Sequence, residues 1–225
     1  MRTQTLFINF EKLARTKGAI DISRVAMVCN DLAIANSSMR NYTIITSGSL
    51  DHIRRGGLLY FVRMSCGHLN EGMDALEQIR KSSELIGMIG RCSSKAQTAF
   101  HDLGKCLRGG TENKRFQKYV GWIRNRIAFH YVADDVLWAI ENRAKRQFRT
   151  SSVTAGPDIH STRFEFGDVL LDTIVCRRFW NISAGADVQR EANRIGDWCF
   201  QKSLRYLEFG GEFVPRFLCE HDVIV

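Results

Sequence analysis

The chain has 225 residues, which is enough for one large domain or two small ones with a sizeable core. Hydrophobic residues make up 44% of it and charged residues 25%, which is a globular composition, and the sequence contains no low-complexity tract. The formal net charge of +8 favours polyanionic partners but does not distinguish nucleic acid from an acidic protein.

The seven cysteines are scattered, and no Cys-x-x-Cys pair indicates a zinc or redox site. Four of the six histidines show no metal-like spacing with carboxylates or thiols: His52, His101, His160 and His221. We therefore expect no metal and no cofactor. The N-terminus lacks the apolar run of a signal peptide, and no stretch of about 18 apolar residues predicts a membrane span. We therefore expect a cytoplasmic protein that does not enter a membrane.

Apolar residues recur at helical spacing through the first 150 residues, which contain no proline. After Asp21 or Ser23 as a candidate N-cap, the spacing predicts a helix over 25–39. A stripe over 58–79 predicts a second, longer helix, and one over 96–103 predicts a third that ends before Gly109 and Gly110.

A fourth helix is expected from about residue 112 through the segment GWIRNRIAFHY at 121–131, with Asp134 or Asp135 capping the next one over 136–148. Residues 150–166 are rich in Ser, Thr and Gly around Pro157 and predict a loop. Two more helices are expected over 168–180 and 187–209. These elements predict an all-α bundle of six to eight helices over 1–149, a linker over 150–166, and C-terminal helices over 167–225 packed on the same bundle.

The segment 121–131 combines polar side chains with bulky apolar ones. At about 100° per residue, Phe116, Val120, Ile123 and Ile127 define an apolar face, and His130 falls close to it. Arg126 lies one turn before His130 on the same side, Arg124 lies on the other edge, and Asn125 points away. His130 is either a core histidine satisfied by a neighbouring group, with arginines at the rim, or part of a phosphate-binding cleft.

The residues RNRIAFH, Arg124 to His130, resemble the signature of the HEPN superfamily, an Arg followed by four to six residues and a His, with a polar residue after the Arg. The preceding GHLNEGMDAL resembles the preceding helix of that family, and the resemblance covers about residues 20–148. It is closest to bacterial HEPN proteins associated with abortive infection. One departure is Tyr131, which directly follows His130, whereas toxins of the family that are neutralised by a nucleotidyltransferase carry a tyrosine two residues beyond the histidine.

The resemblance implies a metal-independent endoribonuclease, with two motifs facing each other across a basic cleft in a homodimer. His130 would move protons at the ribose 2′-OH or the leaving 5′-oxygen, because an imidazole titrates near neutral pH. Arg124 would hold the scissile phosphate through its fork of donors, and Arg126 competes for that role. Asn125 would orient the histidine or the substrate. The product would be a 2′,3′-cyclic phosphate.

The resemblance also implies a biological role as a toxin or effector of bacterial phage defence or of a toxin–antitoxin system, with RNA as substrate and an antitoxin or other defence protein as a possible partner. The chief alternative is a catalytically inactive HEPN domain that binds RNA or nucleotide, or that scaffolds a partner protein. A third interpretation is a helical interaction protein in which the segment 121–131 is core.

A basic stretch with Arg143, Lys145 and Arg146 follows the motif and is either an RNA-backbone track or a solvated helix face. Arg177 and Arg178 are expected to be surface charge. Tyr60 and Trp122 are expected to be core aromatics rather than base-stacking platforms.

Overall fold

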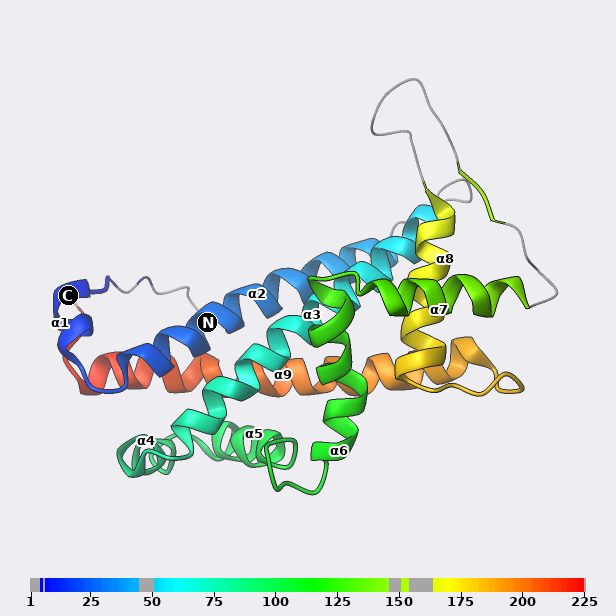
Figure 1. Cartoon of the computed structure of the whole chain (residues 1–225). Helices are drawn as coiled ribbons and strands as arrows, with labels where there is room; N and C mark the ends of the chain where they lie inside the picture. The colour runs from blue at the N-terminus through cyan, green and yellow to red at the C-terminus, as the bar shows by residue number, and fades with distance from the viewer. Residues whose placement is uncertain (1–4, 6, 45–50, 146–150, 154–163, 225) are drawn as a thin grey trace. The chain divides into compact units, whose positions relative to one another are not determined.

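The computed structural model describes residues 5, 7–44, 51–145, 151–153 and 164–224. Within these residues the secondary structure is helical, and the only β pairing is an isolated bridge between Ile8 and Ile224. The expectation of an all-α fold is confirmed (Figure 1). The described residues form nine α-helical segments, and seven of them lie within residues 1–149, where six to eight were expected. Apolar periodicity did not reveal α1 (Phe10–Arg15) and α4 (Ser83–Ile89), because both are too short.

Three of the expected helices are much longer than the sequence pattern predicted. They are α2 (Ala19–Ile44), α3 (Asp51–Ile79) and α9 (Val188–Glu220). The remaining α-helices are α5 (Ser94–Gly104), α6 (Asn113–Phe116), α7 (Ala133–Ala144) and α8 (Glu165–Thr173). The loop expected over 150–166 lies partly outside the described residues, and its last residues already belong to α8.

Three segments have the wider hydrogen-bonding pattern of a π-helix. They are η2 (Gln117–Gly121), η3 (Arg124–Ala128) and η4 (Ile174–Phe179). Because π-helical turns are rare, mostly single turns inside α-helices, and often found at functional sites, their location is informative. One of them, η3, holds the Arg and Asn of the motif.

The chain divides into two compact units that are interleaved in sequence. Unit 1 contains residues 1–33, 68–114 and 201–225, and unit 2 contains residues 34–67 and 115–200. The boundaries expected at residues 149 and 167 are therefore not those of the structure, because α2, α3 and α9 each contribute residues to both units.

Unit 1 is built around apolar stripes that the sequence pattern identified. The buried stripe of α2 includes Val25, Val28 and Leu32, and that of α3 includes Leu69, Met73, Leu76 and Ile79. The second half of α9 adds aromatic rings: Tyr206, Phe209, Phe213 and Phe217. Helix packing is close, since Tyr206 OH donates to Gly72 O at 3.3 Å and a Cβ at Gly72 would lie 2.6 Å from the Tyr206 ring.

A buried ion cluster also holds unit 1 together. Lys202 Nζ lies 2.8 Å from Asp102 Oδ2 and 2.8 Å from Glu112 Oε2, and the lysine is almost entirely buried. Burial lowers the pKa of Lys202, but hydrogen bonds to the two carboxylates outweigh it and raise that pKa overall. The ammonium therefore stays charged between the two carboxylates.

Unit 2 contains the three π-helical segments and the motif. Its core is formed by apolar side chains of η2 to α7, of η4 and of the first half of α9: Val120, Ile123, Ile127, Ala139, Ile174, Val175, Phe179, Trp180 and Ile195. Trp180 Nε1 donates to Tyr119 O at 3.2 Å, and α7 lies against α8 (Figure 1). No helix among the described residues is long and apolar enough to cross a membrane.

Candidate functional site

The motif begins in a helix that buries the apolar face expected from the sequence. Phe116, Val120, Ile123 and Ile127 are all buried, so the helical phase was predicted correctly up to Ile127. Arg124 to Ala128 form the π-helix η3, and the helix ends at Phe129, whose φ of −118° and ψ of −3° leave the helical path. The next residues turn before α7 starts at Ala133.

His130 lies in this turn, and its side chain is exposed. The expectation that His130 points with the apolar residues, one turn beyond Arg126, is therefore wrong. The physical reason is that wider π-helical turns and the end of the helix both break the advance of about 100° per residue on which that expectation depended. His130 is consequently not a core histidine, which removes one of the two interpretations of the motif.

Two contacts with α3 hold the start of the turn. Arg63, itself 4% exposed, donates from Nη1 to Ile127 O at 2.9 Å. This bond satisfies a carbonyl at the end of η3 that has no helical partner further along the chain. The Phe129 ring lies over Gly67, where a Cβ would come within 2.8 Å of the ring. The glycine therefore permits the close approach of the ring to the helix.

A buried carboxylate holds the turn on its other side. Asp135 is fully buried, and Arg126 donates to it through Nε at 2.6 Å and Nη2 at 3.2 Å. Arg178 of η4 binds the same carboxylate, with Nε 2.7 Å from Oδ1. The hydrogen bond to Asp135 raises the pKa of Arg126. Asp135 thus does not cap α7, whose N-cap is Val132 without a side-chain hydrogen bond. The expectation that Arg178 is surface charge is wrong, because Arg178 binds a buried carboxylate.

These contacts separate the two arginines that competed for the phosphate. Two donor nitrogens of Arg126 are engaged by Asp135, so Arg126 has a structural role that the sequence did not predict. Arg124 is partly exposed, and its Nη1 donates to Asn125 Oδ1 at 3.1 Å. A guanidinium is a planar fork of donors whose geometry matches phosphate.

Aromatic side chains near the motif are more exposed than expected. Trp122 is 50% exposed, Phe129 51% and Tyr131 66%, and Tyr60 on α3 is 48% exposed. The expectation that Trp122 and Tyr60 are core residues is therefore wrong. Trp122 stacks on Phe179 at a centroid distance of 6.2 Å, which leaves the rest of the ring at the surface. Exposed aromatic rings beside cationic side chains are a common surface for single-stranded nucleic acid.

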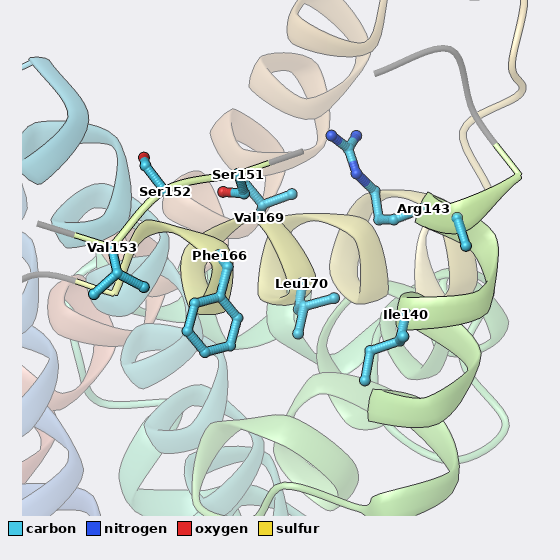
Figure 2. Close-up of a pocket in the computed structure, with 9 residues that line it drawn as sticks. Ile140, Arg143, Ser151, Ser152, Val153, Phe166, Val169 and Leu170 are labelled. Atoms are coloured by element: carbon cyan, nitrogen blue, oxygen red, sulfur yellow. The ribbon is translucent and has the colours of Figure 1, made fainter. Parts of the chain in front are cut away.

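The basic stretch is only partly described. Arg143 is partly exposed and Lys145 is exposed at the end of α7, while Arg146 lies outside the described residues. Arg143 borders a cavity of about 400 Å³ between α7, α8 and residues 151–153. Figure 2 shows Ile140, Phe166 and Leu170 along this cavity, with the Arg143 guanidinium turned away from them. The cavity is therefore lined mainly by apolar side chains, and the Arg143 guanidinium lies away from them.

Unit 2 also has a larger cavity of about 1300 Å³ that borders α8 and the first half of α9. Its lining includes one guanidinium, Arg40, and four carboxylates: Glu165, Asp168, Asp172 and Asp197. These negative charges repel phosphate, so this cavity does not suit RNA. Within the described part of the chain, no group of three or more His, Cys, Asp or Glu side chains could hold a metal ion.

Four residues that organise the site were missed by sequence reasoning: Arg63, Gly67, Asp135 and Arg178. Arg63 was detectable as a lone cation within the apolar run LLYFVRMSCG, where it must be either buried with a partner or a break in the stripe. For Asp135 and Arg178 no local signal exists, because their contact joins residues far apart in the sequence.

Comparisons of the chain with protein-family models, with curated proteins and with solved structures found no match.

Proposed function

We propose that this protein is a metal-independent endoribonuclease whose site contains Arg124, Asn125 and His130. The single observation that carries the proposal is the exposed His130 on a turn held from both sides by buried polar contacts, directly after a π-helical segment with Arg124 and Asn125. A structural histidine would not need this exposure. A proton-transfer residue needs both access to substrate and a fixed backbone.

In the proposed reaction, His130 takes the proton of a ribose 2′-OH, and the resulting oxygen attacks the adjacent phosphorus. The P–O5′ bond breaks, which leaves a 2′,3′-cyclic phosphate and a 5′-hydroxyl once the leaving oxygen is protonated. Arg124 holds the non-bridging oxygens, where negative charge increases in the transition state. Asn125 orients Arg124 through the bond to its Nη1. None of these steps requires a metal ion.

The proposal includes a homodimer, because one motif supplies one histidine and the reaction gains from a base and an acid on opposite sides of the phosphate. A two-fold axis beside the motif duplicates His130 and Arg124 without any new sequence. The exposed rings of Phe129 and Tyr131 on either side of His130 are compatible with burial against a second copy. Light scattering should then report about twice the chain mass of 25.7 kDa.

The biological role that goes with this activity is that of a toxin or effector in bacterial phage defence or a toxin–antitoxin system, with an antitoxin or another defence protein as possible partner. It is supported by the resemblance of the motif and by the basic net charge of +8, which suits an RNA substrate. Expression of the wild-type chain should arrest bacterial growth, and expression of a His130→Ala chain should not.

The test is cleavage of a fluorescent single-stranded RNA by four purified chains: wild type, His130→Ala, Arg124→Ala and His101→Ala. His101 is an exposed histidine of α5 in unit 1 and serves as the matched control. We expect the first two variants to lose cleavage while melting like wild type, because both side chains are at least partly exposed. Full cleavage by His130→Ala would overturn the assignment.

Arg126→Ala separates the two arginines. Removing it leaves the buried Asp135 with one partner instead of two, so this variant should melt at a lower temperature. Arg124→Ala should keep its melting temperature and lose RNA cleavage. If instead Arg124→Ala cleaves normally while folded Arg126→Ala does not, Arg126 is the phosphate ligand.

A further inference from the structure

We infer that Asp135 is a positioning residue for His130: its carboxylate fixes the turn from which the imidazole projects. The expected effect on RNA cleavage rests on the proposed function, whereas the fixing of the turn rests on geometry alone. Asp135 touches neither the motif histidine nor, in this account, the RNA. It acts through Arg126 and the backbone between them.

The first observation is the place of the two ion-pair partners in the sequence. Arg126 precedes His130 and Asp135 follows it, so the ion pair closes a short loop with the histidine inside. Both carboxylate oxygens take part, with Arg126 Nε at 2.6 Å from Oδ2 and Nη2 at 3.2 Å from Oδ1. A two-point contact of this kind restricts rotation as well as distance. The backbone closes the same loop, since Val132 N donates to Arg126 O at 3.4 Å.

The second observation is that the carboxylate itself is immobilised. Asp135 is fully buried, and Arg178 from η4 places Nε 2.7 Å from Oδ1. The Arg178 guanidinium in turn lies 5.1 Å from the centroid of the Trp138 ring on α7. The carboxylate is therefore shared by a residue of the motif segment and a residue of η4, and it cannot shift toward one guanidinium without lengthening its contact with the other.

The third observation concerns His130. No hydrogen bond to another residue that the structure describes holds its imidazole. Its orientation before substrate binds thus depends on the backbone of the turn, and a displacement of about 1 Å can cost a reaction about 100-fold in rate. Asp135 and Arg63 are the buried groups that fix that backbone, from α7 and α3 respectively. A buried charge shared by two arginines is hard to replace by an apolar residue at this position.

The test compares Asp135→Asn and Asp135→Glu with Asp102→Asn. Asp135→Asn keeps the side-chain volume but loses the charge, and Asp135→Glu keeps the charge but moves it. Asp102 is the matched control, because it also binds a buried cation, Lys202, but lies in unit 1. We expect both Asp135 variants to lower kcat for single-stranded RNA at least about tenfold while Kd changes less than about twofold. Asp102→Asn should lower the melting temperature and leave kcat unchanged.

A role in stability alone predicts a different pattern: a lower melting temperature for the Asp135 variants with full kcat per folded molecule. Retention of kcat by Asp135→Glu would likewise overturn the inference, because it would show that the charge matters and its position does not. Amide hydrogen exchange provides a readout that does not depend on RNA cleavage. Exchange at residues 127–132 should become at least about tenfold faster in Asp135→Asn than in wild type, and should be unchanged in Asp102→Asn.

The two proposals therefore fail separately. If the wild-type chain does not cleave RNA but exchange at 127–132 accelerates in Asp135→Asn, the proposed function is wrong and the inference that Asp135 fixes the turn stands. If exchange at 127–132 is unchanged in Asp135→Asn, the inference that Asp135 fixes the turn is wrong, whatever the wild-type chain does to RNA.

Discussion

Two adjacent glycines of α9 should respond in opposite ways to the same substitution. A Cβ at Gly210 would lie 2.3 Å from Cys29 Sγ and 3.1 Å from Val25 Cγ1 on α2, whereas a Cβ at Gly211 meets nothing within 4 Å. Gly211→Ala should stabilise the protein by about 1 kcal/mol through helix propensity. Gly210→Ala gains the same amount but overpacks the helix contact by about 3 kcal/mol, which gives a net loss of about 2 kcal/mol.

The assay is urea unfolding followed by circular dichroism, with Cys29→Ala as the second arm of a double-mutant cycle. Removing the sulfur from Cys29 removes the closest atom, so Gly210→Ala should cost at least about 1 kcal/mol less in the Cys29→Ala background. Equal unfolding midpoints for Gly210→Ala and Gly211→Ala would refute the packing of α9 on α2 within unit 1. So would a cycle with no coupling between positions 29 and 210.

The remaining predictions concern acid stability, thiol reactivity and salt dependence. Hydrogen bonds from the Ser93 hydroxyl and backbone N–H lower the pKa of Glu212 below its ordinary 4.5. The ionised carboxylate therefore stabilises the folded protein above pH 4.5, and this stabilisation is lost as pH falls through the lowered pKa. Glu212→Gln should therefore flatten the fall in urea midpoint below pH 4.5, and an unchanged fall would contradict the assignment. Burial raises the pKa of Cys29 to about 11 and that of Cys106 to about 12. Iodoacetamide at about pH 8 should therefore label the exposed Cys219 first, as measured by mass spectrometry. Early labelling of Cys106 would contradict its burial. Neutralising Arg143, Lys145 and Arg146 together should flatten the salt dependence of RNA binding measured by fluorescence anisotropy, and an unchanged slope would identify the stretch as a solvated helix face.

Much of the fold could be predicted because apolar periodicity reports burial directly. Val25, Val28 and Leu32 on α2, and Ala96, Ala99 and Leu103 on α5, are buried as their spacing predicted. The pattern failed at the ends of the long helices, since polar positions within α9 and its Pro215 gave no sign that the helix extends to Glu220. Periodicity also could not show that α2, α3 and α9 contribute to two compact units, because that division depends on contacts between distant segments.

In the candidate site, the sequence predicted the buried helical face up to Ile127 but not the geometry beyond it. Arg124 and Asn125 lie on the surface of one helical turn, but His130 left the expected face because η3 is a π-helix and ends at Ala128. A fixed angle per residue cannot anticipate a change of helix type. Asp135 was expected as a possible cap because it directly precedes the helix expected over 136–148, but its carboxylate binds Arg126 and Arg178 instead. Long-range ion pairs of this kind leave no periodic signal.

The most direct test of the central claim is the chemistry of the RNA ends. Wild-type protein in excess EDTA is incubated with a single-stranded RNA, and the products are analysed by mass spectrometry beside those of His130→Ala. The account predicts a 2′,3′-cyclic phosphate and a 5′-hydroxyl from wild type, no product from His130→Ala, and resistance of RNA that carries 2′-O-methyl groups. Cleavage that requires added metal ion, or products that carry a 5′-phosphate, would contradict it.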